Sequence, residues 1–268
     1  MPVYNDLDKR MKEFYECIPK TKLMRRCPVV IRIDGRSFHT FTRGFQKPFD
    51  DVLMETMQET MKYLCENVQG CVLGYTQSDE ISLILIDYKK LTSSAFFDYE
   101  VQKVCSITAS MATMAFNMNF QRIYSEKLSR MDNPQEKERL QNVYGKKCFT
   151  AMFDSRCFNI PKEEVANYLF WRQNDASRNS IQMVGQANFT HKELQRKSCS
   201  DIQDMLMLQR GINWNDLETC KKRGCCCFKE EYDADGTLRT RLVVDKEIPV
   251  FKEEGRNYIE KLIYVGES

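Results

Sequence analysis

Apolar residues recur with two periods along the first 160 residues, one typical of strands and one typical of helices. Short runs rich in β-branched and other apolar residues predict strands at about residues 28–34, 71–75, 81–87 and 149–153. Apolar residues three and four positions apart predict a helix that starts at Asp50 and a long helix that contains Val104 and Met118. The predicted order is strand, helix, strand, strand, helix, strand.

That order is typical of the ferredoxin-like, or split βαβ, arrangement, in which both helices pack on one face of an antiparallel sheet. The predicted fold class is therefore α+β with a βαββαβ unit, and the two helices leave the other face of the sheet open. A charged segment at residues 6–17 predicts a short amphipathic helix ahead of the sheet. The polar segment Ser129–Lys147 contains Pro134 and Gly145, which predicts a mobile loop able to cover a substrate.

The last hundred residues predict further helices and a hairpin. Helices are expected at about 162–173 and 199–209, and strands at about 224–229 and 239–244. No internal repeat or low-complexity linker separates these elements from the sheet. We therefore expect residues 1–160 to form the catalytic region with its N-terminal helix, and residues 161–268 to form a helical and β-hairpin lobe packed on it.

The composition limits the classes of function. With 268 residues, 42% hydrophobic and 29% charged, the chain can bury a sizeable core and is too apolar to be disordered. Forty basic and 38 acidic side chains give a formal net charge of +2, so no global field draws the protein to nucleic acid or membrane. Any polyanion must be bound by local patches.

Twelve cysteines would suggest disulfides in a small secreted protein, but the chain opens without the basic start and apolar core of a signal peptide. We therefore expect reduced thiols and a cytoplasmic location. No Cys-x-x-Cys pair occurs and His39 and His191 are the only histidines, so a structural zinc site is not expected. No apolar stretch approaches the roughly 20 residues of a membrane span.

Two acidic residues stand at predicted strand ends. Asp34 ends the first strand, and Asp79 lies at the tip of the hairpin formed by the second and third strands. Neighbouring strands would bring both carboxylates together, and Mg²⁺ prefers such hard oxygen ligands, to which the Gly35 carbonyl could add one more. The alternative is that these acids only cap turns. Glu80 would point to the opposite face of a regular strand and is expected behind the metal ligands.

The segment Gly35–His39 could present consecutive backbone N–H groups to phosphate oxygens, with Gly35 permitting a positive φ. Lys47 follows and could reach a triphosphate, although it could equally be a solvated lysine, and His39 could be a packed or surface histidine. Phosphoryl transfer needs an in-line nucleophile and positive charge on the phosphate oxygens, and a pair of magnesium ions supplies both. The combination predicts a nucleotidyl-transferring enzyme.

A polar stretch from Trp171 to Asn179 follows the predicted C-terminal helix. Arg172 and Arg178 are suited to phosphate or base contacts, because guanidinium groups bind planar oxyanions through two hydrogen bonds. The alternative is that these polar side chains only cap the end of the helix.

Four motifs, taken in order, closely resemble the tRNA-histidine guanylyltransferase family. They are Ile31-Arg32-Ile33-Asp34-Gly35-Arg36-Ser37-Phe38-His39, Lys47-Pro48-Phe49-Asp50, Tyr75-Thr76-Gln77-Ser78-Asp79-Glu80 and Trp171-Arg172-Gln173-Asn174-Asp175. The resemblance covers roughly residues 4–245 and is most specific in the first and third motifs. It implies a polymerase-palm fold that adds nucleotides to the 5′ end of tRNA, in the 3′-to-5′ direction.

The resemblance also implies roles for individual residues. Two Mg²⁺ ions would be held by Asp34, the Gly35 carbonyl and Asp79. The triphosphate of ATP, GTP or another nucleoside triphosphate would be held by the backbone of Gly35, Arg36, Ser37, Phe38 and His39, and by Lys47 and Ser78. Arg32 would support the activation step, and Glu80 would act beside Asp79. Contacts to tRNA would come from Arg172, Arg178 and Asn179, and the assembly would be a homotetramer.

In the family, ATP, or GTP in some members, first activates a 5′-monophosphate, and the 3′-hydroxyl of the incoming nucleotide then displaces AMP. Members that add the extra guanylate of tRNA-histidine carry His-Ile-Asn-Asn where this chain reads Ser177-Arg178-Asn179-Ser180. This departure resembles the guanylyltransferase-like branch, whose members prefer templated repair of tRNAs truncated at the 5′ end. Strict specificity for tRNA-histidine is therefore not expected.

Two other classes of function fit parts of the pattern. A nucleotide cyclase or a 5′-to-3′ polymerase would use a similar palm with two acids. A non-catalytic RNA-binding module can share the βαββαβ order, because RNA-recognition motifs stack bases on such a sheet. Here the sheet edge carries acids, which favours catalysis.

Overall fold

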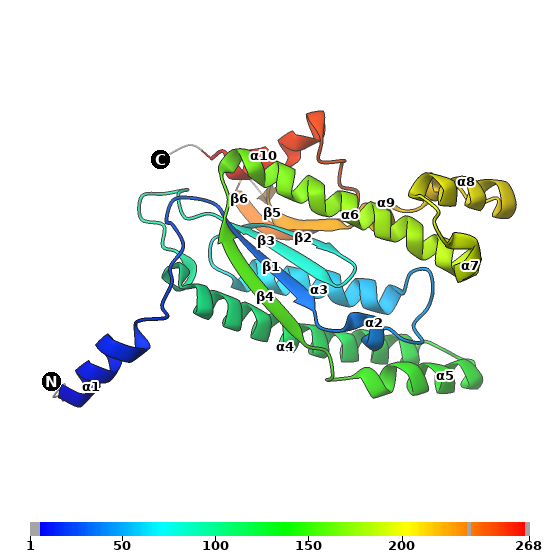
Figure 1. The fold of residues 1–268 in the computed structure, drawn as a ribbon, viewed down its shortest axis with the longest axis horizontal. Helices are drawn as coiled ribbons and strands as arrows, with labels where there is room; N and C mark the ends of the chain where they lie inside the picture. Colours follow the sequence, from blue (N-terminus) through cyan, green and yellow to red (C-terminus); the bar gives the residue numbers. More distant parts are fainter. Residues whose placement is uncertain (1–5, 235–236, 266–268) are drawn as a thin grey trace.

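The computed structural model of the protein describes residues 6–234 and 237–265. A six-stranded antiparallel sheet with the order β4-β1-β3-β2-β5-β6 runs through it (Figure 1). The strands are β1 (Val29–Gly35), β2 (Cys71–Gln77), β3 (Glu80–Leu85), β4 (Phe153–Asn159), β5 (Cys225–Ala234) and β6 (Thr237–Asp245). With helices α3 (Asp51–Asn67) and α4 (Val101–Ser129), the first four strands form the predicted βαββαβ unit, so the α+β palm fold is confirmed.

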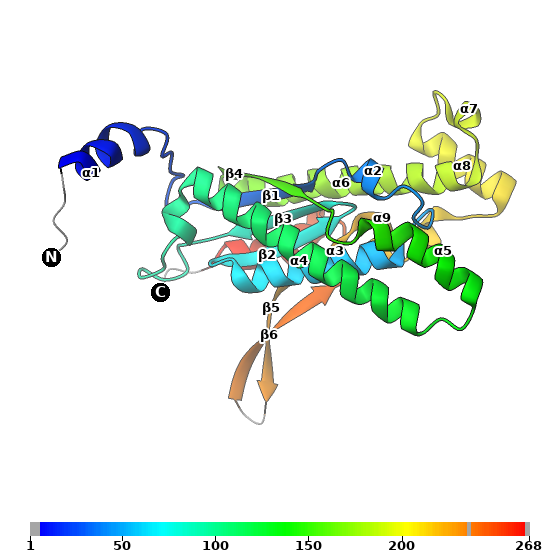
Figure 2. The same ribbon diagram turned by 90° about the horizontal axis from the view of Figure 1, so that it is seen from below.

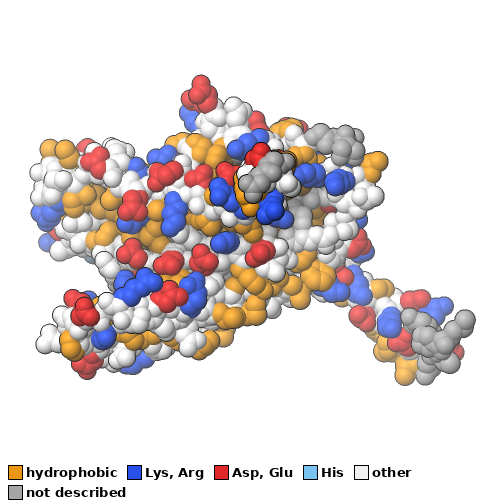
Figure 3. Space-filling model, turned by 180° about the vertical axis from the view of Figure 1, so that it is seen from behind, with side chains coloured by type: hydrophobic (Ala, Val, Ile, Leu, Met, Phe, Trp, Pro, Cys, Tyr) orange, Lys and Arg blue, Asp and Glu red, His pale blue; other side chains and the backbone are white. Residues whose placement is uncertain are grey.

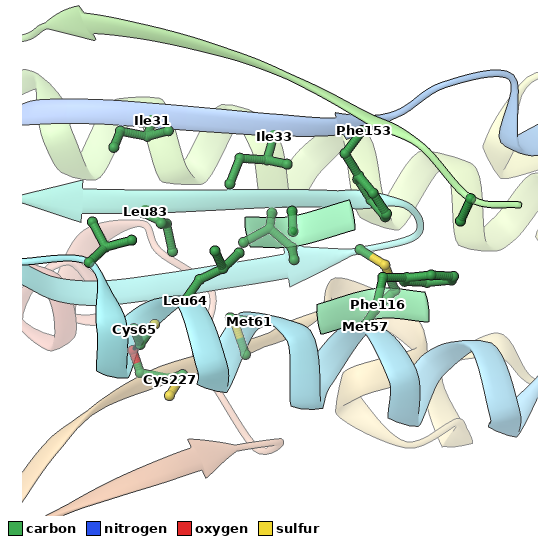
Figure 4. Close-up of a cluster of buried hydrophobic side chains, with 14 of the residues drawn as sticks. Ile31, Ile33, Met57, Met61, Leu64, Cys65, Leu83, Phe116, Phe153 and Cys227 are labelled. Atoms are coloured by element: carbon green, nitrogen blue, oxygen red, sulfur yellow. Dashed lines mark hydrogen bonds between the residues drawn. The ribbon is translucent and has the colours of Figure 1, made fainter. Parts of the chain in front are cut away.

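Helices α3 and α4 pack on one face of the sheet, as the apolar spacing predicted. Asp50 caps α3 by accepting a hydrogen bond from the Leu53 N–H at 3.0 Å, which fixes the start of that helix. Side chains from both helices and from alternate positions of the strands interdigitate in the main core (Figure 4). Members of this core include Ile31, Ile33, Met57, Met61, Leu64, Leu83, Phe116 and Phe153.

The C-terminal lobe covers the other face of the sheet, which the βαββαβ unit alone would leave open. Helix α6 (Lys162–Asn188) and helix α10 (Asn257–Ile263) contribute Val165, Leu169 and Ile259 to a second core with β1, β2 and β3. Helix α6 extends well beyond the predicted end near residue 173, because apolar positions that continue its inner face, such as Ile181 and Val184, pack against α8 (Cys199–Arg210). The polar stretch after Trp171 is therefore helical.

Hairpin β5–β6 continues the palm sheet, because β5 pairs with β2. Gly74, which pairs with Cys227 of β5, also packs closely on α3: a Cβ there would lie 2.4 Å from the Cys65 sulfur. Successive residues of the cysteine triplet face opposite sides, so Cys225 and Cys227 join the main core while Cys226 joins the second core. The far end of the hairpin projects from the body (Figure 2).

The prediction of a mobile loop at Ser129–Lys147 is wrong. Residues Pro134–Tyr144 form helix α5, capped by the Asn133 side chain, which accepts hydrogen bonds from the N–H groups of Gln135 and Glu136. Polar composition misled the prediction, because buried Tyr144 and half-buried Leu140 and Val143 anchor the helix to the main core. Strand β4 also starts later than predicted, since Phe149 adopts a positive φ of 60° that a strand does not allow.

The remaining short elements connect these parts. They are α1 (Asp6–Met11), η1 (Lys12–Glu16), α2 (Phe38–Phe41), η2 (Phe96–Tyr99), η3 (Gly145–Lys147), α7 (His191–Leu194), η4 (Trp214–Asp216), α9 (Thr219–Arg223) and η5 (Glu253–Arg256). Across the described residues, none of the helices is both long and apolar enough to pass through a bilayer.

An aromatic cluster fastens α2 and α5 to the core helices. The ring of Phe116 lies 5.4 Å from Phe38, 5.6 Å from Phe41 and 5.2 Å from Phe153, centroid to centroid. Phe45 stacks on Tyr144 of α5 at 4.6 Å. Edge-on and stacked rings at such distances stabilise a core beyond their buried area. The cluster therefore fixes the segment that follows Asp34.

We expect Phe116→Ala to lower the free energy of unfolding by about 3–5 kcal/mol, because it opens a cavity among the packed rings of the aromatic cluster. Urea denaturation measures the change. Leu208→Ala is the matched control, since Leu208 is 84% exposed on α8 and should change stability by no more than about 0.5 kcal/mol. Equal effects of the two substitutions would contradict the assignment of the cluster as core.

Candidate functional site

Asp34 and Asp79 meet at one end of the sheet. Strand β1 ends at Asp34 and Gly35, and the Gly35 N–H donates to the Asp79 carbonyl at 3.0 Å. Asp34 is also directly opposite Glu80 in the β1–β3 register. The structure therefore brings together the two acids that the sequence placed at neighbouring strand ends.

The position of Asp79 depends on a two-residue turn. Gln77 pairs with Glu80, so Ser78 and Asp79 alone connect β2 to β3. Ser78 adopts a positive φ of 51°, and its hydroxyl donates to Asp79 Oδ1 at 3.0 Å. Such short turns fix the register of a hairpin, and here the turn also orients the carboxylate.

The site carries more negative charge than its surroundings offset. Burial, and after it the negative charge of Asp34, raise the pKa of Asp79 to about 6, while the Ser78 hydrogen bond opposes the shift. A cation bound between the two carboxylates would remove this repulsion. The arrangement therefore favours a bound positive charge.

A third carboxylate, which the sequence analysis did not identify, lies at the same edge. Asp154 is opposite Asp34 in the β1–β4 register and so shares its face of the sheet. It is exposed and forms an ion pair with Arg156 at 2.9 Å. Within the described residues, no three or more Asp, Glu, His or Cys side chains come close enough to hold a metal. Any ion would use two carboxylates and oxygens of other kinds, such as the Gly35 carbonyl.

Glu80 is not a free acid. Arg172 of α6 donates to both Glu80 oxygens, from Nε at 2.8 Å and from Nη2 at 2.7 Å, and both side chains are buried. Burial raises the pKa of Glu80, and the hydrogen bonds and charge of Arg172 oppose that rise. Glu80 is directly opposite Asp34 in the register and so shares its face of the sheet, which differs from the predicted opposite face. Arg172, a partner that was not foreseen, holds it there.

The ion pair extends from the site to the surface. Arg172 Nη2 also contacts Asp175 Oδ2 at 2.9 Å, and Arg178 pairs with the other oxygen of Asp175. Arg178 is 62% exposed and Arg172 is 8% exposed. A contact from Arg172 to RNA would require breaking its pair with Glu80, whereas Arg178 is accessible. The one-turn spacing of Arg172 and Asp175 would have signalled this pair if the segment had been recognised as helical.

Arg32 lies on the same face of β1 as Asp34. It sits between Ser82 of β3 and Arg156 of β4 in the register, and its charge lowers the pKa of Glu80. Its Nε is buried and has no hydrogen-bond partner among the described residues. A buried guanidinium nitrogen without a partner is suited to an incoming oxyanion.

Position 35 needs a glycine, but not for the predicted reason. Its φ is not positive; instead, a Cβ there would lie 2.3 Å from the Phe38 ring, so only glycine fits. The positive φ of 55° belongs to Ser37, which precedes α2. Phe38 is buried in the aromatic cluster, so only its backbone could serve a phosphate.

The backbone N–H groups of the segment Gly35–His39 differ in whether they are free to bind a ligand. The Arg36 N–H is already used, because it donates to the Met152 carbonyl at 2.8 Å. The N–H groups of Phe38 and His39 belong to the first turn of α2, where helix geometry leaves them without an internal acceptor. The side chains of Arg36, Ser37, His39 and Lys47 are exposed. Two of the predicted amides and several exposed donors are thus open to a ligand.

A pocket of about 670 Å³, including its part open to solvent, lies beside the turn that carries Asp79. Ser78 lines it together with α3, α6 and α9. Its apolar lining includes Phe49, Leu53, Met54, Met57 and Met183, and its polar lining includes Gln58, Asn179 and Lys222. The sequence analysis identified only Ser78 and Asn179 of these, because methionines on helix faces are indistinguishable from core residues by periodicity.

A family model described as tRNA(His) guanylyltransferase matches residues 8–161. An uncharacterised mimivirus protein is 28% identical over 90% of this chain and 82% of its own, and the tRNA(His) guanylyltransferase of Saccharomyces cerevisiae is 26% identical over 75% and 82%.

A solved bacterial tRNA(His) guanylyltransferase-like protein in complex with ATP is also similar to the chain. It superposes with a TM-score of 0.81 and 44% identity, over 97% of this chain and 100% of that one. Another such structure, in complex with GTP, gives 0.77 and 41% over the same shares. Since the family model matches more than half of the residues, the chain belongs to the tRNA(His) guanylyltransferase family of nucleotidyltransferases.

Proposed function

We propose that this protein adds nucleotides to the 5′ end of tRNA in the 3′-to-5′ direction, using base pairing with the opposite strand as the template. The observation that carries the proposal is the meeting of Asp34 and Asp79 through the Gly35–Asp79 hydrogen bond, beside a pocket and a segment with open backbone donors. This geometry suits a reaction in which nucleotide and RNA end are joined at phosphorus.

The residues present fit magnesium. The donor set consists of oxygens, from Asp34, Asp79 and the Gly35 carbonyl, and the raised pKa of Asp79 reflects a charge that a cation would neutralise. When bound, a pair of Mg²⁺ ions would polarise the reacting phosphoryl groups and stabilise the charge that develops on them. Glu80 would keep the turn and its aspartate in place through its pair with Arg172.

The ATP and GTP complexes of the similar bacterial structures support nucleotides as substrates. In our proposal, the base enters the pocket beside Ser78, and the triphosphate extends toward the Phe38 and His39 amides and Lys47. Base contacts from Gln58 and Asn179 would be polar, and Met57 and Met183 would pack on the ring.

The proposed reaction has two steps. An oxygen of the RNA 5′-phosphate attacks the α-phosphorus of ATP, and pyrophosphate leaves. The 3′-hydroxyl of the incoming nucleotide then attacks the RNA 5′-phosphorus, AMP leaves, and the hydroxyl proton passes to solvent. Arg32 would stabilise the activated phosphate, because its Nε is buried and needs an acceptor. No covalent bond to the protein is required.

The departure at Ser177–Ser180 supports repair of truncated tRNAs over strict recognition of tRNA-histidine. Arg178 and Asn179 would contact the RNA from helix α6, where Arg178 is exposed and Asn179 lines the pocket. The homotetramer implied by the resemblance and the cytoplasmic location remain predictions.

We expect Asp34→Asn and Asp79→Asn each to reduce nucleotide addition by at least about 10²–10³-fold, because each removes a carboxylate charge that would hold the Mg²⁺ ions on the reacting phosphates. The assay uses labelled ATP and GTP with 5′-monophosphorylated tRNA that lacks one 5′ residue, compared with full-length tRNA-histidine. Asp204→Asn, an exposed change on α8, is the control. Labelled adenylate on the 5′ end supports the proposal; a cyclic product or extension of the 3′ end contradicts it.

The raised pKa of Asp79 predicts a pH-dependent stability. The folded state takes up a proton near pH 6, whereas an unfolded aspartate does so near 3.8. Ionised Asp79 therefore destabilises the fold above pH 6, and protonation relieves this as the pH falls toward 4. Without divalent ions, Asp79→Asn should be more stable than wild type at pH 7.5 and should lose that advantage by pH 4. Urea denaturation at both pH values measures it; an advantage independent of pH would refute the burial of charge.

Removing one partner of the buried ion pair should be costly. We expect Arg172→Met to lower the free energy of unfolding by about 3–5 kcal/mol, and a second change, Glu80→Gln, to restore a large part of it. Arg178→Met is the control, because the exposed pair with Asp175 is worth less than about 1 kcal/mol. If Arg172→Met weakened tRNA binding but left stability unchanged, Arg172 would be an RNA contact and not a support for Glu80.

A further inference from the structure

Trp171 of helix α6 is a large aromatic side chain that the described residues leave half uncovered. It is 53% exposed, whereas the other tryptophan of the chain, Trp214, donates its indole N–H to Ser180 Oγ at 3.0 Å. Trp171 does not line the pocket beside Ser78 and has no part in the proposed function. One exposed apolar side chain is ordinary on a protein surface, so the surroundings of the ring decide what it can bind.

The Trp171 ring is held from one side. The guanidinium carbon of Arg172 lies 4.5 Å from the ring centroid, and Arg172 is itself fixed by its two hydrogen bonds to Glu80. The ring of Tyr168 packs against Trp171 at 6.0 Å between centroids. An aromatic ring that is already fixed loses little conformational entropy when a flat ligand stacks on it. Trp171 is therefore a preformed stacking surface.

This stacking surface lies beside the acids of the candidate site. The hydroxyl of Tyr168 is hydrogen-bonded to that of Ser82 at 2.8 Å, and Ser82 is opposite Arg32 in the β1–β3 register. Burial is the main cause that raises the pKa of Tyr168 to about 12, while the positive charges of Arg32 and Arg172 oppose the rise. Tyr168 thus connects Trp171 to Arg32, whose Nε has no hydrogen-bond partner among the described residues.

A basic residue lies on the same side of α6 as Trp171. Trp171, Asp175 and Arg178 are four and three residues apart, so they share one side of the helix. The side chain of Arg178 is 62% exposed, and that of Asp175, its ion-pair partner, is 22% exposed. None of the three lines the pocket, although α6 contributes other residues to it. Helix α6 therefore borders two surfaces, the pocket and a surface that we call the Trp171 side, which consists of Trp171 and Arg178.

Electrostatic attraction alone is a weak source of affinity for RNA in this protein. The formal net charge is +2, and on the face seen from behind the described basic and acidic side chains are interspersed (Figure 3). Binding to a phosphate backbone by charge needs several cations that act together. Stacking of bases on aromatic side chains is the other general source of affinity, and it needs single-stranded nucleotides, because paired bases are already stacked in their helix.

We propose that the Trp171 side binds the unpaired strand that lies opposite the RNA 5′ end, with one base stacked on Trp171 and a phosphate in contact with Arg178. The inference rests on the proposed function, which brings a 5′ end to Asp34 and Asp79. The opposite strand is single-stranded wherever it extends beyond the duplex, so its bases meet the protein close to these acids. The incoming nucleotide would occupy the pocket, and the unpaired strand would occupy the Trp171 side. Trp171 and Arg178 are roughly 10 Å apart along the helix, at 1.5 Å per residue.

The first test is the steady-state kinetics of nucleotide addition to two hairpin RNAs with a 5′-monophosphate. One has a single unpaired template nucleotide at its 3′ end, and the other has several further unpaired nucleotides. Trp171→Ala should raise the KM for the long-overhang RNA at least about fivefold, because a stacked base is lost, and should leave the KM values for ATP and for the short-overhang RNA unchanged. Trp171→Phe, which keeps a ring, should retain most of the affinity.

Tyr264→Ala is the matched control, because Tyr264 is an aromatic residue that is 49% exposed outside the site. It should change neither KM. A rise in the KM for ATP, or equal losses with both RNAs in the Trp171→Ala protein, overturns the proposal.

The second test uses fluorescence to locate the contact. Trp214→Phe leaves Trp171 as the only tryptophan of the chain. The long-overhang RNA should quench the emission of Trp171, because an unpaired base stacks on the indole. The same RNA with an abasic overhang keeps every phosphate and should not quench it, and neither should GTP alone. Quenching by GTP alone, or equal quenching by the abasic RNA, refutes the stacking.

Asp79→Asn in the same background separates this proposal from the proposed function. It should abolish nucleotide addition and keep the quenching, because the strand can bind without the acid. Nucleotide addition without quenching overturns the stacking and leaves the proposed function intact. Quenching by the long-overhang RNA in a protein that adds nothing to any 5′ end supports the stacking and overturns the proposed function.

Discussion

The hydrogen bond between the Gly35 N–H and the Asp79 carbonyl is the constraint on which the candidate site depends. It joins the end of β1 to the β2–β3 turn and so holds two carboxylates together despite their mutual repulsion. Burial and, second, this repulsion raise the pKa of Asp79 to about 6. Sheet pairing and the packed Phe38 ring must supply the free energy that keeps the acids adjacent. Strain of this kind is typical of a site whose geometry is set before its ligand arrives.

Much of this arrangement could be predicted from the chain alone. Strand periodicity placed Asp34 and Asp79 at strand ends, and the βαββαβ order made those ends neighbours. Strand alternation misplaced Glu80, because the pairing register between distant strands, which sets it opposite Asp34, cannot be read from one strand alone. The backbone of Gly35 was less accessible to sequence reasoning, because the need for glycine comes from Phe38, three residues later, whose ring occupies the space of a Cβ.

Other parts could not be predicted, because they depend on contacts between distant segments. Helix α5 is polar along most of its length and is held by Tyr144, whose ring stacks on Phe45. Helix α6 continues past residue 173 because Ile181 and Val184 meet Ile202 and Leu206 of α8. From the sequence, Arg172 resembled an exposed basic residue. Its buried ion pair with Glu80 could not be predicted, because the two residues are far apart in the chain.

The position of α6 changes how the C-terminal lobe should be understood. One helix places Arg172 against Glu80, lines the pocket with Asn179 and Met183, and presents Arg178 to solvent. Because these residues lie along consecutive turns, a shift of α6 would move the support of the acids, the wall of the pocket and the exposed guanidinium together. The palm strands provide the acids, but the space in which a nucleotide could meet them exists only with the lobe in place. The lobe is therefore part of the site and not an appendage to it.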